Sequence, residues 1–418
     1  MKKIFIFLVI FIVVISCGKK NEIKNASFDD STKVDAIDSL IDSIITKKLE
    51  LNQPIMLDEI VMNDSVNSKK LSKTNNISKD YVKGLYLSAY TIVSKRSKTI
   101  IDSAYLAGIN TIIFDLKNMN GDVFIDLPDS LDFLNHNEIR IVDIDKIVKK
   151  IHSYDMKAVA RIVMFHDQYI AGNDFDMRPQ NINGGVWVES KRKKPSWLDS
   201  SNPFVQNDLL KIIKLVAETS IDEIQMDYVR FPTQGNLSEA QFYFQKQDEI
   251  NSYNDSLYIK RNKYDVIKEF VKRAHNICSK YQVKLTADVF AIVAWQRKID
   301  YKNTGQKLEL MTDYLDMIHP MIYPSHFVSN FNHRDNVENE PYQILYQGTK
   351  LTVKHSNKKC KVVPYIQAFN WKSNYKKEYL FAQIDAIKNS GGDGYILWNA
   401  QNRYLETLSW IIEKKKGD

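Results

Sequence analysis

Residues 221–232 read IDEIQMDYVRFP, and this stretch decides the fold. Apolar and polar side chains alternate along it, so that Gln225 and Asp227 fall on one face of a predicted strand. Pro232 cannot continue a sheet ladder, so the strand is expected to stop at a loop. A strand covered on both faces is normally almost entirely apolar. The polar residues at its end, with Arg230 just beyond, indicate either catalytic groups at the mouth of a barrel or a buried Asp227–Arg230 pair that holds a loop.

Short apolar runs alternate with amphipathic segments on both sides of this stretch. The segments between the strands are helical in pattern, and in one of them Asn202 is a plausible cap with Pro203 at the first helical position. About eight β–α repeats within about 330 residues predict an α/β fold of the (β/α)8, or TIM, barrel type. A doubly wound open sheet is the alternative, but no G-x-G-x-x-G follows an early strand. The predicted strands lie at 84–87, 111–115, 158–165, 221–232, 283–289, 315–323, 361–367 and 394–398, and the clearest helices at 94–106, 141–152, 203–218 and 264–281.

Two long insertions follow the third and fourth predicted strands, at residues 167–202 and 233–260. Both come after C-terminal strand ends, so both are expected at the same mouth of the barrel. Both are rich in aromatic residues, which either stack on sugar rings or form small satellite cores under the loops. The aromatic residues concerned are Trp187, Trp197, Phe242, Tyr243, Phe244, Tyr253 and Tyr258.

The composition is that of an ordinary globular protein, with 44% hydrophobic and 26% charged residues among 418. The net charge of +7 is spread widely, and no basic stripe with interleaved aromatic residues is present, so nucleic acid is not an expected partner. Cys278 and Cys360 have no C-x-x-C neighbour, so neither predicts a metal site. Whether these two cysteines pair is left open by the sequence.

The first residues predict export from the cytoplasm. Residues 1–16 combine two lysines, an apolar run and a small residue before Cys17, as in a secretory signal. The segment resembles a bacterial lipoprotein signal with Cys17 as the lipidated residue, and an uncleaved membrane anchor is the alternative. Residues 17–78 read as a flexible tether with a possible helix at 34–51, and 79–418 as the barrel domain. The expected location is the cell envelope, with a lipid anchor in a membrane and the barrel facing the periplasm or exterior.

Polar residues accumulate at the ends of successive predicted strands. In a barrel these ends share one rim, so the side chains are expected to surround one site. A single histidine on a strand is more often a core group than a ligand, but the accumulation is harder to explain by packing alone. The catalytic candidates are Asp227 and Asp288; the candidates for substrate binding are Asp115, Lys117, His166, Asp167, Gln225, Arg230, His319, Tyr323, His326, Gln367, Trp398 and Asn399.

Glycoside hydrolysis is the chemistry that suits this set best. It needs two carboxyl groups, one ionised and one protonated, about 5 Å apart for retention and farther apart for inversion. Asp227 and Asp288 fall on adjacent strands, and Arg230 is expected to keep Asp227 ionised as nucleophile or charge stabiliser. Asp288 lies in an apolar run, so desolvation is expected to raise its pKa and make it the general acid, although a buried structural carboxylate is the alternative. No cofactor and no metal ion is predicted.

The motifs at these strand ends resemble those of the family named "putative glycoside hydrolase", also called domain of unknown function 4015, over roughly residues 82–415. The family implies a barrel similar to the α-amylase group, with an Asp nucleophile after strand four and an acid after strand five, the places of Asp227 and Asp288. This chain has Asp288 where the α-amylase pattern has Glu, and Asn118 and Ala368 where relatives often have Asp. The motifs are DEIQMDYVRFP (222–232), FDLKNMNG (114–121), ARIVMFHD (160–167), TADVFA (286–291), MIHPMIYPSHF (317–327), PYIQAF (364–369) and YILWNA (395–400).

Three functions follow from the sequence. The favoured one is a surface-anchored glycoside hydrolase that acts on a cell-wall or extracellular polysaccharide. The second is a catalytically weak barrel that binds glycan or wall polymer, which the changes at Asn118 and Ala368 keep open. The third is a metal-dependent hydrolase, but no H-x-H or H-x-x-x-H ligand spacing occurs. Its ligands would be Asp115, His166, Asp167 and His319.

Overall fold

A computed structural model describes residues 81–190 and 194–417. The chain divides into two units, residues 1–72 and 73–418, and every described residue belongs to the second. The predicted signal at 1–16, the lipidated Cys17, the tether at 17–78 and its possible helix therefore lie outside the described residues. Within the described ranges, no helix has the length and apolar character that crossing a bilayer requires.

Among the described residues, eight parallel strands form the centre of the barrel unit, one of them in two halves. The order of the strand segments around the sheet is β11-β10-β9-β7-β5-β2-β1-β13-β12. The predicted strand 361–367 is interrupted by Pro364, which has no N–H to donate. β11 and β12 are therefore two halves of one barrel strand. The order of strands thus begins and ends on the two halves of the same barrel strand. A parallel bridge between Met321 and Tyr365 joins β12 to the end of β10. The predicted (β/α)8 barrel is confirmed. The barrel strands are β1 (Val82–Leu87), β2 (Thr111–Lys117), β5 (Lys157–Val163), β7 (Glu223–Asp227), β9 (Lys284–Val289), β10 (Met317–Pro320), β11 (Lys361–Val362) with β12 (Tyr365–Gln367), and β13 (Gly394–Trp398).

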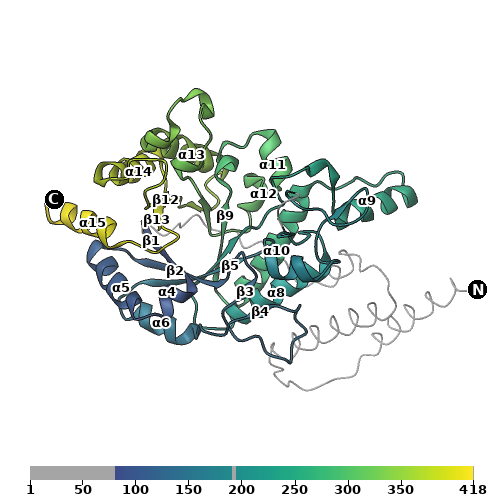
Figure 1. The fold of residues 1–418 in the computed structure, drawn as a ribbon, viewed down its shortest axis with the longest axis horizontal. Helices are drawn as coiled ribbons and strands as arrows, with labels where there is room; N and C mark the ends of the chain where they lie inside the picture. The colour runs from purple at the N-terminus through teal and green to yellow at the C-terminus, as the bar shows by residue number, and fades with distance from the viewer. Residues whose placement is uncertain (1–80, 191–193, 418) are drawn as a thin grey trace, which may run out of the picture. The chain divides into compact units, whose positions relative to one another are not determined.

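Helices surround these strands (Figure 1). The sequence signals at their ends hold in the structure: the Asn202 side chain accepts a hydrogen bond from the Phe204 amide at 2.9 Å, and Pro203 begins α8. Gly108, with φ of +77°, ends α5 in the left-handed conformation that glycine tolerates best. The outer helices are α5 (Arg96–Ala107), α6 (Ile144–His152), α8 (Pro203–Ala217), α10 (Lys263–Lys280), α13 (Pro341–His355), α14 (Lys377–Ser390) and α15 (Leu405–Gly417).

Smaller elements occupy the connections. The helices in the connections are α4 (Ala89–Val93), α7 (Gln168–Asn173), α9 (Tyr243–Asn254), α11 (Lys298–Thr304) and α12 (Leu308–Met311). The 3-10 turns are η1 (Leu237–Glu239), η2 (Ala291–Trp295), η3 (Pro324–His326), η4 (Phe331–His333) and η5 (Val337–Asn339). The short strands are β3 (Asp122–Val123), β4 (Asn137–Glu138), β6 (Gln180–Asn181) and β8 (Ala240–Gln241).

The apolar core has two parts, as expected for a barrel. The larger lies between the sheet and the helices. The smaller fills the interior of the barrel and contains Tyr86, Ile113, Val159, Met317, Tyr323, Val363, Tyr365 and Ile396. Cys278 and Cys360 are both buried, and no disulfide joins the two.

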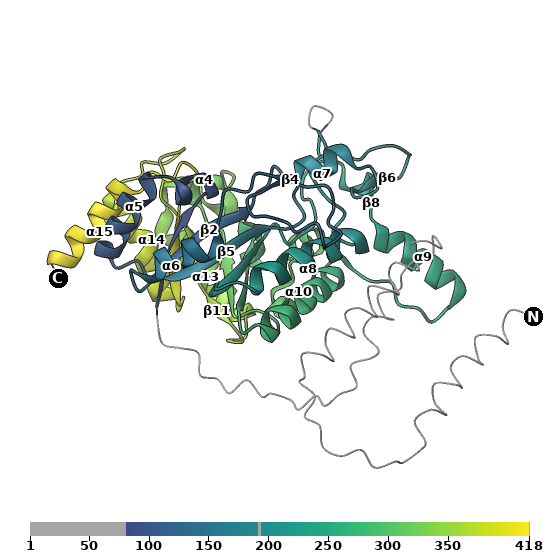
Figure 2. The same ribbon diagram turned by 90° about the horizontal axis from the view of Figure 1, so that it is seen from below.

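The two insertions join each other, because β6 of the first pairs antiparallel with β8 of the second. Figure 2 shows these strands together with α7 and α9 on one side of the unit. Trp187, Trp197, Phe242 and Phe244 are at most 4% exposed and belong to the main apolar core, so these four neither form a separate satellite core nor offer stacking surfaces. Tyr253 on α9, in contrast, is 92% exposed.

Candidate active site

The polar residues of the barrel share the interior face of their strands. Register places Asp115 opposite Arg161, Arg161 opposite Gln225, and Asp288 opposite His319. Because side chains alternate along a strand, Asp227, two residues after Gln225, faces the interior as well. The expected alternation is present over Glu223–Asp227, but the strand ends at Asp227 and not at Pro232, because the chain turns at Tyr228. The acidic residues of β2, β7 and β9 meet near the C-terminal ends of their strands.

One guanidinium lies at the centre of these carboxyl groups. Arg161 Nη1 is 2.5 Å from Asp115 Oδ1, Arg161 Nη2 donates a short hydrogen bond to Asp227 Oδ2, and Arg161 Nε is 3.7 Å from Asp288 Oδ2. The Arg161 side chain is 14% exposed, more than any of the three carboxyl groups. One cation thus faces three potential anions in a nearly dry environment. Such a cluster favours retention of at least one proton on the carboxyl groups.

Asp227 accepts two hydrogen bonds. Besides the Arg161 contact, its Oδ1 accepts from the Tyr228 amide at 2.6 Å. Tyr228 has a φ of +51°, a conformation that bulky residues adopt only under constraint, and it turns the backbone directly after the strand. This strained turn brings the Tyr228 amide to the carboxylate of the preceding residue.

Asp288 is the carboxyl group most strongly biased toward its protonated form. Burial, together with the charge of Asp227, raises its pKa well above the usual range, and Arg161 only partly opposes this. Its Oδ1 accepts from Gln225 Nε2 at 2.5 Å. Its Oδ2 is buried and, in the described part of the chain, has no hydrogen-bond partner. A proton on Oδ2 would therefore have no acceptor on the protein.

Asp115 completes the cluster from β2. Both of its oxygens are occupied, Oδ1 by Arg161 and Oδ2 by the Tyr86 hydroxyl at 2.5 Å. Burial raises the pKa of Asp115, although Arg161 and Tyr86 both act to lower it. Asp115 is thus tied to the barrel on both sides, whereas Asp288 keeps one oxygen unused.

The separation of Asp227 and Asp288 follows from their shared contact. Both carboxyl groups contact the same guanidinium, so their nearest oxygens lie within about 10 Å, inside the range spanned by two-carboxylate glycosidases. Access is narrower: the Asp227 side chain is 4% exposed and the Asp288 side chain 1%. The two groups therefore share one guanidinium near the C-terminal ends of their strands, and both are nearly closed off from solvent.

A second polar layer lies deeper in the barrel. Thr286 Oγ1 donates to Glu223 Oε1 at 2.9 Å, and His319 Nε2 is 3.9 Å from the same oxygen. The other ring nitrogen of His319 lies 2.9 Å from the Val363 carbonyl. Gln225 connects this layer to the carboxyl groups, since its amide contacts both Asp288 and the Tyr365 hydroxyl. The predicted binding residues Gln225 and His319 thus support the site from within.

The expected Asp227–Arg230 pair is replaced by Asp227–Arg161. Arg161 projects from the interior of the neighbouring strand, whereas Arg230 lies beyond the turn at Tyr228. The Arg230 guanidinium instead lies over three rings, with its central carbon 4.7 Å from the centroid of Trp197, 5.1 Å from that of Tyr228 and 4.8 Å from that of Phe290. The pKa of Arg230 is lowered by burial.

Lys117 and Asp167 form a fully buried ion pair with an N–O distance of 2.7 Å. Asp167 also caps α7 by accepting from the Ile170 amide at 2.8 Å. Both side chains are 0% exposed, which gives the pair a structural role in place of the predicted contact with substrate. His166 lies above this pair, with Nδ1 3.0 Å from the Met119 carbonyl and its ring against Trp197 and Tyr228.

The remaining predicted rim residues gather on the other side of the mouth. The rings of Tyr323 and Trp398 are stacked with centroids 4.8 Å apart, and His326 lies 5.4 Å from Tyr323. Gln367 and Asn399 shape the loops here: Gln367 Nε2 donates to Ser373 Oγ at 2.8 Å, and Asn399 Nδ2 donates to the Ala368 carbonyl at 2.7 Å.

The two positions that differ from the resembling family do not line the carboxyl cluster. Asn118 organises the turn between β2 and β3, where its Nδ2 donates to Asp122 Oδ2 at 2.8 Å. Ala368 is buried. Among residues 81–190 and 194–417, no three His, Cys, Asp or Glu side chains are gathered as metal ligands, and this includes the four residues of the metal-dependent alternative.

Three residues of the site were missed by sequence analysis: Arg161, Tyr86 and Tyr365. Arg161 carried a signal, because it is a charged residue within the otherwise apolar run of β5, KAVARIV, where burial demands a carboxylate partner. The two tyrosines carried none, since an aromatic residue on a strand is an ordinary core residue.

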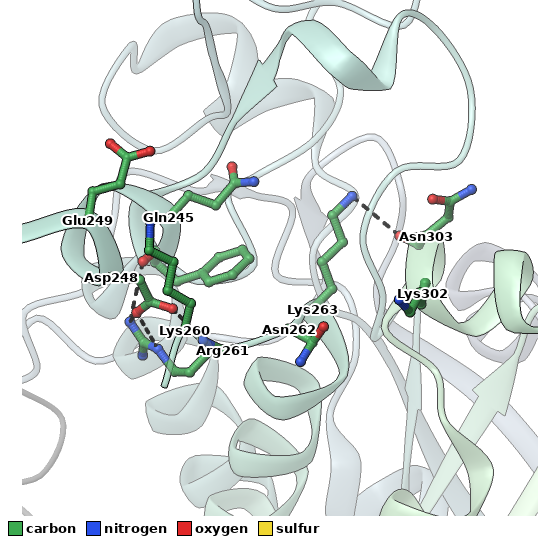
Figure 3. A pocket seen from close by; sticks show the side chains of 10 residues that line it. Gln245, Asp248, Glu249, Lys260, Arg261, Asn262, Lys263, Lys302 and Asn303 are labelled. Carbon is green, nitrogen blue, oxygen red and sulfur yellow. Dashed lines mark hydrogen bonds and ion pairs between the residues drawn. The ribbon is translucent and has the colours of Figure 1, made fainter. Parts of the chain in front are cut away.

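A separate pocket of about 350 Å³ lies between α9, the start of α10 and the end of α11 (Figure 3). Arg261 pairs there with Asp248 at 2.7 Å. Lys263 Nζ is 3.5 Å from the Asn303 carbonyl and lies over the rings of Phe231 and Phe242. Burial lowers the pKa of Lys263 to about 8. None of the three clustered carboxyl groups lines this pocket.

Fold and site together define a barrel protein of the glycoside hydrolase class, with acidic residues at the C-terminal mouth. The chain belongs to the family described as "Putative glycosyl hydrolase domain", which matches residues 84–404. The resemblance in the sequence is thereby confirmed. No match was found among curated proteins.

Solved structures with a similar fold include glycoside hydrolases. The glycoside hydrolase domain of PgaB (BpsB) from Bordetella bronchiseptica has a TM-score of 0.59 at 12% identity, covering 79% of this chain and 97% of that one. A β-galactosidase from Marinomonas ef1 gives 0.55 at 9% identity, with coverage of 80% and 59%. An endo-1,4-β-D-mannanase from Thermotoga petrophila gives 0.50 at 11% identity, with coverage of 81% and 100%. At these identities the similarity establishes the shared fold.

Proposed function

We propose that this protein hydrolyses glycosidic bonds of a cell-wall or extracellular polysaccharide by a two-carboxylate mechanism. The observation that carries the proposal is the arrangement of Asp227 and Asp288 on one guanidinium, with Asp227 hydrogen-bonded by Arg161 and the Tyr228 amide and Asp288 biased toward its protonated form. Two titratable groups whose environments differ in this way are suited to opposite roles in acid and base catalysis.

In this mechanism the Asp288 Oδ2 proton passes to the glycosidic oxygen as the bond between that oxygen and the anomeric carbon breaks. Asp227 stabilises the positive charge on the anomeric carbon or forms a bond to it. Water then supplies the hydroxyl group of the product, and its proton returns to Asp288. Arg161 and Gln225 are positioning residues, because each contacts a reacting carboxyl group at hydrogen-bond or ion-pair distance.

The location of the reaction is part of the same proposal and rests on residues 1–78, outside the described part of the chain. Cys17 carries a lipid that anchors the protein in a membrane of the cell envelope, and the barrel faces the periplasm or exterior. A wall or extracellular polymer is the glycan available there.

The test is a screen of the purified protein against peptidoglycan, wall polysaccharide and exopolysaccharide preparations, with release of new reducing ends as the readout. We expect release from at least one preparation, and Asp227→Asn protein serves as the blank. Absence of release from all preparations would contradict the proposal.

A second function is favoured by one observation, namely that the three carboxyl groups are nearly closed off. Their side chains are 1–5% exposed, so a glycan bound at the rim of this conformation would not reach them. A barrel that binds glycan or wall polymer without cleaving it has this property. It predicts that wild-type protein and the Asp227→Asn variant bind glycan equally and that neither releases reducing ends.

A further inference from the structure

A pocket of about 730 Å³ opens on the side of the mouth where β12 and β13 end, within the size range of about 300–1,000 Å³ that small-ligand sites occupy. Its walls come from the loops after these two strands and from the start of α15. The residues that matter most in it are Phe369, Trp371, Trp398, Arg403 and Glu406, with His326 at the edge.

One wall of this pocket is a run of aromatic rings. Centroid distances are 5.4 Å between Phe369 and Trp398, 5.9 Å between His326 and Phe369, and 4.8 Å between His326 and Trp371. Trp371 ends the run and is 46% exposed, even though Lys372 Nζ lies 4.5 Å from its ring centroid. Packing does not account for a large ring at a pocket wall with this exposure. An aromatic face of this kind suits the C–H face of a pyranose ring.

Charged side chains complete the lining. Arg403 and Glu406 are exposed, and in the described part of the chain neither forms an ion pair. They provide hydrogen-bond donors and acceptors for hydroxyl groups, with one charge of each sign. By contrast, Asn399 uses its amide to hold the Ala368 and Arg403 carbonyls, so its contribution is to the shape of the pocket.

A stacked pair of rings connects the pocket wall with the residues around the carboxyl cluster. Trp398 lines the pocket and stacks on Tyr323 at an interplanar angle of 24°. Tyr323 in turn lies in the electrostatic field of Asp288 and Asp227, which together with burial raise its pKa well above the usual range. The pocket therefore lies beside the carboxyl cluster, on the β12–β13 side of the mouth.

We propose that this pocket is a subsite for a neutral pyranose unit of the glycan chain, with Trp371 as the stacking platform and Arg403 and Glu406 as partners for its hydroxyl groups. The assignment rests on the proposed function, because it places the bound sugar in the same chain as the bond that is cleaved. The subsite predicts that affinity depends on the length of the oligosaccharide, because a longer chain gains a contact that a disaccharide bound at the carboxyl groups lacks.

The experiment measures binding of cellohexaose, mannohexaose and N-acetylchitohexaose by calorimetry to the full chain carrying Asp227→Asn. Adding Trp371→Ala is expected to weaken binding of the preferred hexasaccharide by about 3- to 10-fold, the worth of one aromatic contact, and Trp371→Phe is expected to restore most of it. In an otherwise wild-type chain, Trp371→Ala is expected to raise KM by a similar factor with kcat unchanged. Tyr105→Ala is the control, because that ring is 54% exposed on α5 and lines neither pocket.

The outcomes separate the two proposals. Unchanged binding and KM in Trp371→Ala, with cleavage intact, would overturn the subsite and leave the hydrolase proposal standing. Weakened binding in Trp371→Ala without cleavage by the wild type would support the subsite and overturn the hydrolase proposal. Absence of binding of all three hexasaccharides by the wild type and by Asp227→Asn would overturn the subsite as a site for neutral sugars.

Discussion

Replacing Arg161 with methionine removes the one cation that contacts all three clustered carboxyl groups, at 2.5 Å from Asp115, at 3.7 Å from Asp288 and in a short contact with Asp227. Breaking a buried ion pair from one side costs about 3–5 kcal/mol of stability, because the remaining charges are left without a partner. We expect a loss of this size for Arg161→Met near neutral pH. The control is Arg140→Met, since Arg140 is 56% exposed, and surface changes of this kind usually alter stability by less than about 0.5 kcal/mol.

The loss should depend on pH in a defined direction. Arg161 lowers the pKa of both Asp115 and Asp288, so its removal raises both. The folded variant then holds protons that the unfolded chain releases above a pKa of about 3.9, and its stability falls as pH rises through the folded pKa values. Urea denaturation of wild type and variant from pH 5 to pH 9 should show a difference that grows with pH. A difference that is absent, or equal at all pH values, would refute the assignment of Arg161 as the partner of these carboxyl groups.

Three further predictions concern single residues. Asp288→Asn should lower kcat by about 10²–10⁴-fold, and it should abolish the fall in activity that wild-type protein shows as pH rises through the raised pKa of Asp288; a pH–rate profile of both proteins checks this. Lys263→Met should raise stability at pH 7 by about 1–3 kcal/mol, because the wild type buries a charged amine whose pKa is lowered from 10.5 to about 8. Between these two pKa values the folded wild type binds fewer protons than the unfolded chain, so the stability of the wild type increases with pH. Urea denaturation should therefore show that the advantage of Lys263→Met shrinks as pH rises from 8 to 10.5. Cys17→Ala should abolish incorporation of radiolabelled palmitate in bacterial cells, and continued labelling would contradict the proposed anchor.

The barrel itself could be predicted from the sequence because its signals are local. Alternation at Gln225 and Asp227, the cap at Asn202 with Pro203, and apolar runs of strand length each depend on a few neighbouring residues. Asp288 was expected beside Asp227 because the two residues fall on adjacent predicted strands, and the pairing of β7 with β9 agrees with this. Pro364 can be read in the sequence, but its effect cannot: that it divides one barrel strand into two halves depends on the neighbouring strands.

The partners of the site residues could not be predicted, because they come from strands far apart in the sequence. Arg230 is three residues from Asp227 along the chain, yet the turn at Tyr228 removes it, and Arg161, which lies 66 positions away from Asp227, takes its place. Lys117 and Asp167 had the residue types of a binding site, and only the structure shows that they neutralise each other out of contact with solvent. The residues at the rim could thus be predicted from residue type and position at strand ends. Which of them contribute to the proposed chemistry depends on their burial and their partners, and only the structure shows these.

The central claim is that Asp227 acts on the glycan through its carboxylate, and the most direct measurement is kcat of Asp227→Asn on the polysaccharide that the wild type cleaves. Asp126→Asn is the matched control, because the Asp126 side chain is 77% exposed and lies outside the cluster. We predict a decrease of at least about 10²-fold for Asp227→Asn, with unchanged folding and with full activity in Asp126→Asn. Undiminished turnover in correctly folded Asp227→Asn protein would contradict the account.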